Sequence, residues 1–496
     1  MAKSLFLGVD IGTFETKAAL CDSVGKIVAS AARKHEMTVP QPGWAEHRPI
    51  EDWWNGFVDV TSSVMAHPGA RTGSVEAVAI SAIGPCMLPV DGEGGPLSNA
   101  VLYGVDTRAT KEIDLLADKI GEERIIEFNG NALNSQAVGP KILWLRINRP
   151  DLFEKAAKIV TSTTFLVQKL TGRCIIDHYT AANFTPIYNS LTRSWDDSLC
   201  DEIIELDRLP ELGWSHEIAG TTTAEAANAT GLPEGTPVTV GTIDAAAEAV
   251  SVGAMNPGDL MVMYGSTMFF VTVAGEWTPD GRLWYAPWLF PAQHASLAGL
   301  STSGTLTHWF RDTFAKELDR DQAFPVLAEE ASGSPPGARG LAVLPYFSGE
   351  RTPLHDPEAK GCIFGLNLTH TRADLYRAVL EGIAYGARHV IETFEDIGAK
   401  PNRLLAVGGG TKNRIWLQSV SDISGFDQIL REISIGASYG DAFLAAMAAG
   451  AAEQRDIDAW NPVSEKIIAR TDAVYENGYS VFRDLYRNNK ELMRRI

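Results

Sequence analysis

Two turns that are rich in glycine and hydroxyl side chains, far apart in the chain, have the composition of a paired phosphate-binding site. The first follows the apolar run 5–9 and contains Asp10, Gly12 and Thr13. Glycine there lets successive backbone N–H groups point outward, and such groups form an anion-binding concavity. The second turn, Gly265-Ser266-Thr267, also lies between apolar runs. One such turn alone is often an ordinary hairpin, but two in separate halves favour an enzyme that handles a nucleotide.

Two aspartates have positions that suit phosphoryl transfer. Asp10 stands beside the first turn, and Mg²⁺ prefers one or two carboxylates together with phosphate oxygens. Asp244 follows the strand-like run 238–241 and precedes an alanine-rich segment. A carboxylate there could cap a helix N-terminus, or it could accept the proton of a sugar hydroxyl that attacks a γ-phosphoryl group. The local sequence leaves both roles open.

Other motifs are less specific. The triple glycine 408–410 lacks the Gly-Lys-Ser/Thr ending of a P-loop and the spacing of a dinucleotide fingerprint. It is therefore either a tight strand-to-helix turn or a close approach of backbone to a nucleotide. The small residues of 436–442 favour helix packing in the core, with proximity to a nucleotide as the alternative role. None of the ten histidines lies in an HExxH motif, so the sequence gives no support for a zinc hydrolase.

The composition narrows the functional class. A net charge of −19 argues against a nucleic-acid partner, because binding a phosphate backbone needs a basic face. No apolar run has the length of a transmembrane helix, and Asp10 and Glu15 interrupt the apolar start that a signal peptide would need. The five cysteines are odd in number and never spaced as CxxC, which indicates reduced thiols and no structural zinc site. We therefore expect a cytoplasmic protein without a membrane partner.

The elements that must position these residues alternate between strand and helix. At 496 residues the chain is long enough for two domains or more, and the alternation predicts two similar α/β halves. Asn256-Pro257-Gly258 interrupts the pattern, so we place the boundary between residues 253 and 254. The predicted strands are 5–9, 16–21, 27–33, 75–81, 238–241, 260–263, 268–273 and 404–407; the predicted helices are 50–66, 111–120, 139–148, 162–170, 301–309, 374–394 with Thr371 as N-cap, and one from about 413.

The ordered set of motifs resembles the FGGY family of carbohydrate kinases, over roughly residues 5–450. The most specific match is Gly361-Cys362-Ile363-Phe364-Gly365-Leu366, which continues through 374–381 and looks like the C-terminal signature of the family. Segment 141–144 resembles the N-terminal signature and keeps its lysine and tryptophan, although Gln136 and Val138 depart from the usual pattern. Segments 42–46 and 52–54 also look like the early part of the family.

The resemblance implies a fold and a set of roles. It implies an α/β fold of two actin-like (ribonuclease H-like) domains with a central cleft, in which 1–253 bind the sugar and 254–496 bind the nucleotide. It also implies ATP and Mg²⁺ as cofactors. Asp244 looks like the catalytic base of the family and a sugar ligand, and Asp10 looks like its metal-binding aspartate. The positions that resemble nucleotide-binding residues are Gly12, Thr13, Gly265, Ser266, Thr267, Gly304, Gly409, Gly410 and Asn413.

The substrate is less well defined by the resemblance. Xylulokinases usually carry Met-His-Gly where this chain has Gly84 and Pro85, and Tyr103 stands where a tryptophan commonly precedes the segment that contains Asp106. These four residues, together with Asp244, are the expected sugar contacts, and the expected substrate is a ketopentose-type sugar or a polyol. Homodimer formation is left open. The alternatives are a sugar-independent ATPase of the same fold and a non-catalytic sugar-binding protein.

Overall fold

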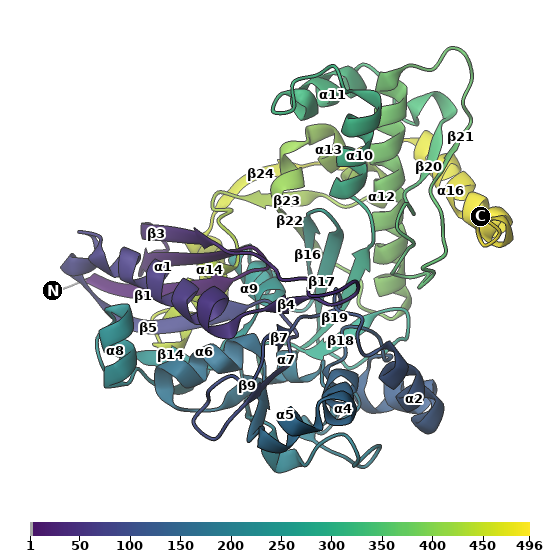
Figure 1. Ribbon diagram of the computed structural model, residues 1–496. Helices are drawn as coiled ribbons and strands as arrows, with labels where there is room; N and C mark the ends of the chain where they lie inside the picture. Colours follow the sequence, from purple (N-terminus) through teal and green to yellow (C-terminus); the bar gives the residue numbers. More distant parts are fainter. Residues whose placement is uncertain (1–2) are drawn as a thin grey trace. The chain divides into compact units, whose positions relative to one another are not determined.

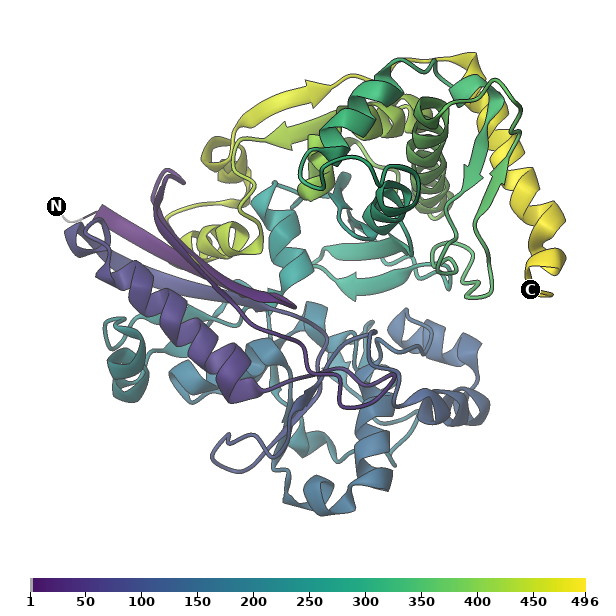
Figure 2. The same cartoon turned by 45° about the horizontal axis from the view of Figure 1, so that its top comes forward.

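The computed structural model describes residues 3–496, and these form two compact units that are each discontinuous in sequence (Figures 1 and 2). The first unit comprises the residues up to Met255 together with 275–295 and 435–462. The second unit comprises 256–274, 296–434 and 463–496. Each unit is built around its own mixed sheet. The division of the sequence at residues 253 and 254 into a sugar-binding and a nucleotide-binding domain stays a prediction.

The sheet of the first unit begins with an antiparallel meander. Its strand order is β13-β14-β5-β1-β2-β3, and β15 also pairs with β5. The central strand β1 is buried on both faces beyond its first residues, which explains why its sequence is a continuous apolar run. The strands are β1 (Lys3–Ile11), β2 (Glu15–Asp22), β3 (Ile27–Lys34), β5 (Gly73–Ala82), β13 (Ile218–Thr221), β14 (Pro237–Thr239) and β15 (Thr242–Ile243).

Two close backbone contacts in this unit, one between a helix and the sheet and one between two helices, are possible because glycine has no side chain there. A Cβ atom on Gly8 of β1 would lie 2.0 Å from the carbonyl oxygen of Ser438, in helix α14 (Ala437–Ala448). A Cβ atom on Gly440 would lie 1.9 Å from the carbonyl oxygen of Ala247, in helix α9 (Asp244–Ser251). The small residues of α14 are therefore packing residues, as the sequence predicts.

The remaining elements of the first unit surround this core (Figure 1). They are β4 (Glu46–His47), η1 (Pro49–Trp54), α1 (Asn55–Ala66), η2 (Ala70–Thr72), β6 (Leu88–Val90), β7 (Ala100–Val101), α2 (Thr110–Ile120), α3 (Glu122–Asn129), α4 (Val138–Asn148), α5 (Pro150–Lys155), β8 (Lys158–Val160), α6 (Ser162–Thr171), β9 (Ile175–Asp177), α7 (His178–Ala181), β10 (Tyr188–Asn189), β11 (Ser194–Trp195), η3 (Leu206–Arg208), β12 (Glu211–Gly213), α8 (Ala224–Thr230), β18 (Trp284–Pro287), η6 (Gln454–Asp456) and α15 (Ile457–Trp460).

The sheet of the second unit has the strand order β19-β17-β16-β22-β23-β24. Its first hairpin pairs β16 with β17 in antiparallel register, with Tyr264 opposite Met268. Helix α16 carries the C-terminus (Figures 1 and 2). The elements are β16 (Asp259–Tyr264), β17 (Met268–Ala274), β19 (His294–Leu300), α10 (Gly304–Phe314), α11 (Ala323–Ser332), η4 (Ala338–Gly340), β20 (Ala342–Leu344), β21 (Cys362–Phe364), α12 (Arg372–Asp396), β22 (Arg403–Val407), η5 (Gly409–Lys412), α13 (Arg414–Ser424), β23 (Gln428–Arg431), β24 (Val463–Ile467) and α16 (Ala473–Met493).

Most predicted elements are confirmed, and the differences have local causes. Thr371 caps α12 in a capping box with Asp374, as predicted. The predicted strand 238–241 ends early, at Thr239, and Gly241 has a left-handed φ of 75°. The predicted helix 301–309 begins only at Gly304, because Ser303 bonds back to the hairpin instead. Over residues 3–496, no helix combines the length and the apolar character that crossing a lipid bilayer requires.

The close approach of α14 to β1 predicts the effect of one substitution. Gly8→Ala should lower the free energy of unfolding by about 1–3 kcal/mol, because the added methyl group meets backbone atoms that cannot move aside. Urea unfolding would measure this. Gly92→Ala is the matched control, since a Cβ atom there meets nothing within 4 Å. Equal stability of the two variants would contradict the packing described.

Candidate active site

The first turn lies between β1 and β2, and we call residues Gly12–Phe14 phosphate loop 1. The amide of Gly12 donates to the carbonyl of Glu15 at 2.9 Å, which closes the turn. The carbonyl of Gly12 accepts a hydrogen bond from Nε2 of His35 at 3.0 Å. Gly12 and Thr13 are only partly buried, so the loop keeps access to solvent. These residues have the exposure that binding an anion requires.

Asp10 lies immediately before this loop, near the end of β1. It stands opposite Lys17 of β2 and Ser81 of β5 in the ladder. The residue is 8% exposed. Burial and the nearby charge of Asp244 raise the pKa of Asp10 to about 8. A cation beside it would relieve this penalty.

Asp244 is the first residue of α9 rather than its cap. The N-cap position belongs to Ile243, and Oδ1 of Asp244 accepts a hydrogen bond from the Ala245 amide at 2.7 Å. The helix-cap role left open by the sequence is therefore wrong. Burial, and then the charge of Glu248, raise the pKa of Asp244 to about 7. The side chain remains partly accessible, which a base that meets a substrate requires.

Three further polar residues of this cluster, Ser81, Glu248 and Asp441, are missed by the sequence analysis. The Ser81 hydroxyl donates to Oδ2 of Asp441 at 2.7 Å and lies 3.4 Å from Oδ1 of Asp10. Asp441 is fully buried, and burial raises its pKa well above the usual range. Burial, and then the charge of Asp10, raise the pKa of Glu248 to about 7. The available signal was a carboxylate inside the small-residue segment 436–442.

The expected sugar contacts divide into two groups. A Cβ atom on Gly84 would lie 2.8 Å from Cγ1 of Ile243, so Gly84 and Pro85 lie next to the start of α9. Asp106 instead is fully buried, and its two oxygens accept bonds from Arg108 and from the Ala45 amide. Both oxygens of Asp106 are therefore already hydrogen-bonded within the protein.

The loop between these positions is held by a buried lysine. Lys141 donates from Nζ to the carbonyls of Leu102 and Tyr103, at 2.6 and 2.9 Å. Burial lowers the pKa of Lys141 to about 8. The lysine of the N-terminal signature thus fixes the backbone at Tyr103.

The second unit brings the other glycine motifs together. The carbonyl of Gly265 accepts a bond from the Gly304 amide at 3.1 Å, and a Cβ atom on Gly304 would lie 2.4 Å from that oxygen. The carbonyl of Ser266 accepts from the Thr305 amide at 3.0 Å. Thr267 is the last residue of the turn between β16 and β17. The start of α10 therefore rests directly against this turn, which we call phosphate loop 2 (Gly265–Thr267).

The triple glycine lies against Tyr264, the last residue of β16. A Cβ atom on Gly408 would lie 2.7 Å from the carbonyl oxygen of Tyr264, and one on Gly410 would lie 2.6 Å from the Trp416 ring. Gly409 has open space around it. Asn413 caps α13 by accepting a bond from the Trp416 amide at 3.2 Å. The structure thus gathers the nucleotide-binding candidates of the second unit around the ends of β16 and β22.

The side chains of this site could bind Mg²⁺ only together with the phosphate oxygens of a bound nucleotide. Within residues 3–496, no group of three or more His, Cys, Asp or Glu side chains is arranged to hold a metal ion. Mg²⁺ needs only one or two carboxylates when phosphate oxygens complete its shell. Asp10 supplies one such carboxylate beside phosphate loop 1.

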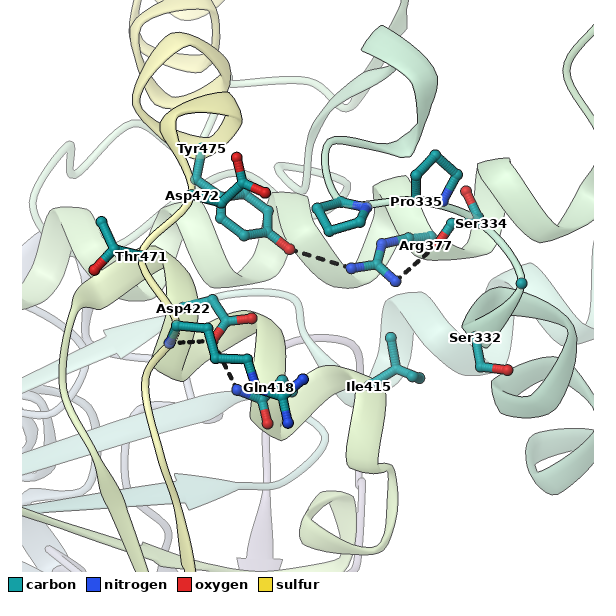
Figure 3. Close-up of a pocket in the computed structure, with 13 residues that line it drawn as sticks. Ser332, Ser334, Pro335, Arg377, Ile415, Gln418, Asp422, Thr471, Asp472 and Tyr475 are labelled. Atoms are coloured by element: carbon teal, nitrogen blue, oxygen red, sulfur yellow. Dashed lines mark hydrogen bonds between the residues drawn. The ribbon is translucent and has the colours of Figure 1, made fainter.

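A separate cavity of about 500 Å³ lies within the second unit (Figure 3). Arg377 donates there to the Tyr475 hydroxyl and to the Ser334 carbonyl, and Asp422 accepts from Gln418. None of the candidate nucleotide-binding residues is among its lining residues. It is therefore separate from the site described above.

Comparison with known proteins places this chain among carbohydrate kinases. A xylulose kinase of Bacillus subtilis is 27% identical over 98% of this chain and 97% of that protein. A xylulose kinase of Escherichia coli is 28% identical over 99% of this chain and 100% of that protein, and a gluconokinase of Bacillus subtilis is 26% identical over 94% and 90%. The crystal structure of xylulose kinase from Rhodospirillum rubrum matches with a TM-score of 0.93 and 29% identity, over 99% of both chains.

The family match covers both halves of the chain. Residues 5–251 match the N-terminal domain, and residues 260–449 match the C-terminal domain, of the FGGY family of carbohydrate kinases. The two-domain α/β fold agrees with this match. The chain belongs to the FGGY family of carbohydrate kinases.

Proposed function

We propose that this protein transfers the γ-phosphoryl group of ATP to a hydroxyl of a ketopentose-type sugar or a related polyol, with Asp244 as the general base. The observation that carries the proposal is the position of Asp244, a partly accessible carboxylate at the start of α9 beside Asp10 and Gly84. Full-length relatives are named as a xylulose kinase and a gluconokinase, and these names support a small carbohydrate as the substrate. Gly84 and Pro85 stand where xylulokinases usually carry Met-His-Gly, so xylulose itself is one candidate among several.

The proposed reaction is an in-line transfer. Asp244 takes the proton of the sugar hydroxyl as that oxygen bonds to the γ-phosphorus, and the bond to ADP breaks. A pKa of about 7 suits this role, because a base is most effective when its pKa lies near the working pH. The outward N–H groups of the two phosphate loops would stabilise the charge on the phosphate oxygens. Mg²⁺ bound at Asp10 would offset part of that charge.

A coupled assay for ADP tests this proposal. Purified protein would be given ATP and Mg²⁺ with ketopentoses, ketohexoses, polyols or gluconate, and we expect one of the sugars or polyols to stimulate ADP release strongly. Equal ADP release without any sugar would instead identify a sugar-independent ATPase. Sugar binding without turnover, detected as a rise in melting temperature, would identify a non-catalytic binding protein.

Asp244→Asn should lower kcat by a factor of about a hundred or more, because the amide cannot accept the proton. The KM values for sugar and ATP should change much less, since the side chain keeps its size and its bond to the Ala245 amide. Steady-state kinetics with the best substrate would measure both. Turnover near that of the wild-type protein would remove Asp244 from the mechanism.

The same substitution should stabilise the protein above about pH 4. The pKa of Asp244 is about 7 in the folded protein and about 4 in an unfolded chain. Between these values the unfolded chain releases a proton that the native state keeps, so the free energy of unfolding falls as the pH rises. A side-chain amide does not titrate in this range. The free energy of unfolding of Asp244→Asn, measured relative to the wild-type protein, should therefore rise by about 1 kcal/mol or more from pH 4 to pH 8.

Urea unfolding at both pH values, without nucleotide or divalent cations, would measure this difference. Asp114→Asn is a matched control, because that carboxylate is exposed on the surface of α2. A pH-independent difference between wild-type protein and Asp244→Asn would show that Asp244 titrates normally in the native state.

A further inference from the structure

Phosphate loop 1 is held from behind by His35, which follows β3. Nε2 of His35 lies 3.0 Å from the carbonyl oxygen of Gly12, so this nitrogen carries the proton and donates it. The backbone amide of His35 donates to the carbonyl of Phe14, also at 3.0 Å. One residue therefore fixes two of the three carbonyl groups of the loop.

A second histidine, His47, lies behind the same loop with its proton position fixed. The indole N–H of Trp53, which can only donate, bonds to Nδ1 of His47 at 3.0 Å. In the neutral ring the remaining proton must then lie on Nε2. The His47 ring is fully buried and meets the His35 ring edge-on, with centroids 5.1 Å apart.

Both rings lie near the backbone of Thr13. Burial lowers the pKa of His47 to about 4 and also lowers the pKa of His35, while the Thr13 backbone opposes this shift on both rings. Nε2 of His47 has no partner within hydrogen-bond distance among residues 3–496. A fully buried N–H donor thus lies near the backbone of Thr13.

Fixing these carbonyl groups determines where the amides of the loop point. The peptide bonds of the loop are trans, and in a trans peptide the C=O and the following N–H point in opposite directions. When His35 binds the carbonyl of Gly12 on one side, the amide of Thr13 must face the other side. The same relation links the carbonyl of Thr13 to the amide of Phe14.

We propose that His35 and His47 are positioning residues for the nucleotide: His35 holds the carbonyl of Gly12, and the buried Nε2–H of His47 favours a Thr13 carbonyl on the same side, so that the amides of Thr13 and Phe14 face the phosphate groups of ATP. The proposal rests on the proposed function, since it takes ATP as the ligand of this loop. Neither histidine touches the reacting atoms. Their contribution is to remove other orientations of two peptide groups before the anion arrives.

Calorimetric titration with a non-hydrolysable ATP analogue and Mg²⁺ tests the proposal without relying on turnover. His35→Leu removes the donor to Gly12 and should raise the Kd about tenfold, the usual consequence of losing one hydrogen bond to a binding loop. His35→Gln keeps an N–H donor of similar reach and should stay within about threefold of the wild-type Kd. A purely structural role would not distinguish leucine from glutamine in this way if both variants are equally stable.

His47 gives a second, independent pair of variants. In His47→Gln the amide oxygen can accept from the Trp53 indole and the amide nitrogen can donate toward Thr13, whereas His47→Leu can do neither. We expect a raised Kd only for the leucine variant. His178→Leu is the matched control, because His178 is a buried histidine that bonds to the Tyr188 hydroxyl instead, and its loss should leave the Kd unchanged.

Hydrogen exchange on the wild-type protein keeps the proposal testable if a leucine variant does not fold. The amides of Thr13 and Phe14 should exchange more slowly once the analogue is bound. Unchanged exchange there, or a folded His35→Leu protein with the wild-type Kd, would overturn the role of the histidines. Failure of the wild-type protein to bind the analogue would instead overturn the proposed function.

Discussion

The constraint on which the first unit depends is the burial of several carboxyl groups in one small volume. Asp10, Asp244, Glu248 and Asp441 each have a pKa raised by burial, and the charge of at least one neighbouring acid adds to each shift. Lys17 opposes the shift at Asp10 and at Glu248. Such an arrangement costs stability, and groups of this kind cluster at functional sites because chemistry uses the shifted pKa values. The rest of the unit must hold these groups together against their repulsion.

Close packing between backbone segments keeps the elements that carry these acids in place. The contacts of Gly8 with α14 and of Gly440 with α9 leave no room for a methyl group, so β1, α14 and α9 have a fixed spacing. Each of these elements carries an acid of the cluster. Ser81 on β5 adds the hydrogen bond that joins Asp441 to the sheet. The acids cannot move apart without opening these contacts, and this rigidity keeps Asp10 and Asp244 at a fixed distance from each other.

The sequence predicts much of the fold, because the strands, both hairpins and the Thr371 cap depend on neighbouring residues. It does not predict partners that are far apart in the chain. Ser81 and Asp441 are 360 residues apart, and nothing local to either indicates a bond. His35 and Gly12 are separated by 23 residues and by a strand reversal. The sequence alone could not decide whether Asp244 is a helix cap or a catalytic base, since aspartate is also a favoured N-cap residue. Asp106 is a similar case, because the bond that it accepts from the Ala45 amide, 61 residues away, appears only in three dimensions.

In both phosphate loops, hydrogen-bond donors behind the loop fix the backbone carbonyls, but different residues supply these donors. In loop 2 the carbonyls of Gly265 and Ser266 accept bonds from the first amides of α10, where a helix necessarily has unpaired N–H groups. In loop 1, His35 supplies the donors with its ring and its own amide. In both loops the carbonyl groups are fixed on one side, so the amides that follow them must face the other side. The glycine and hydroxyl residues that identify each loop in the sequence permit this geometry, but it is the donors behind the loop that impose it.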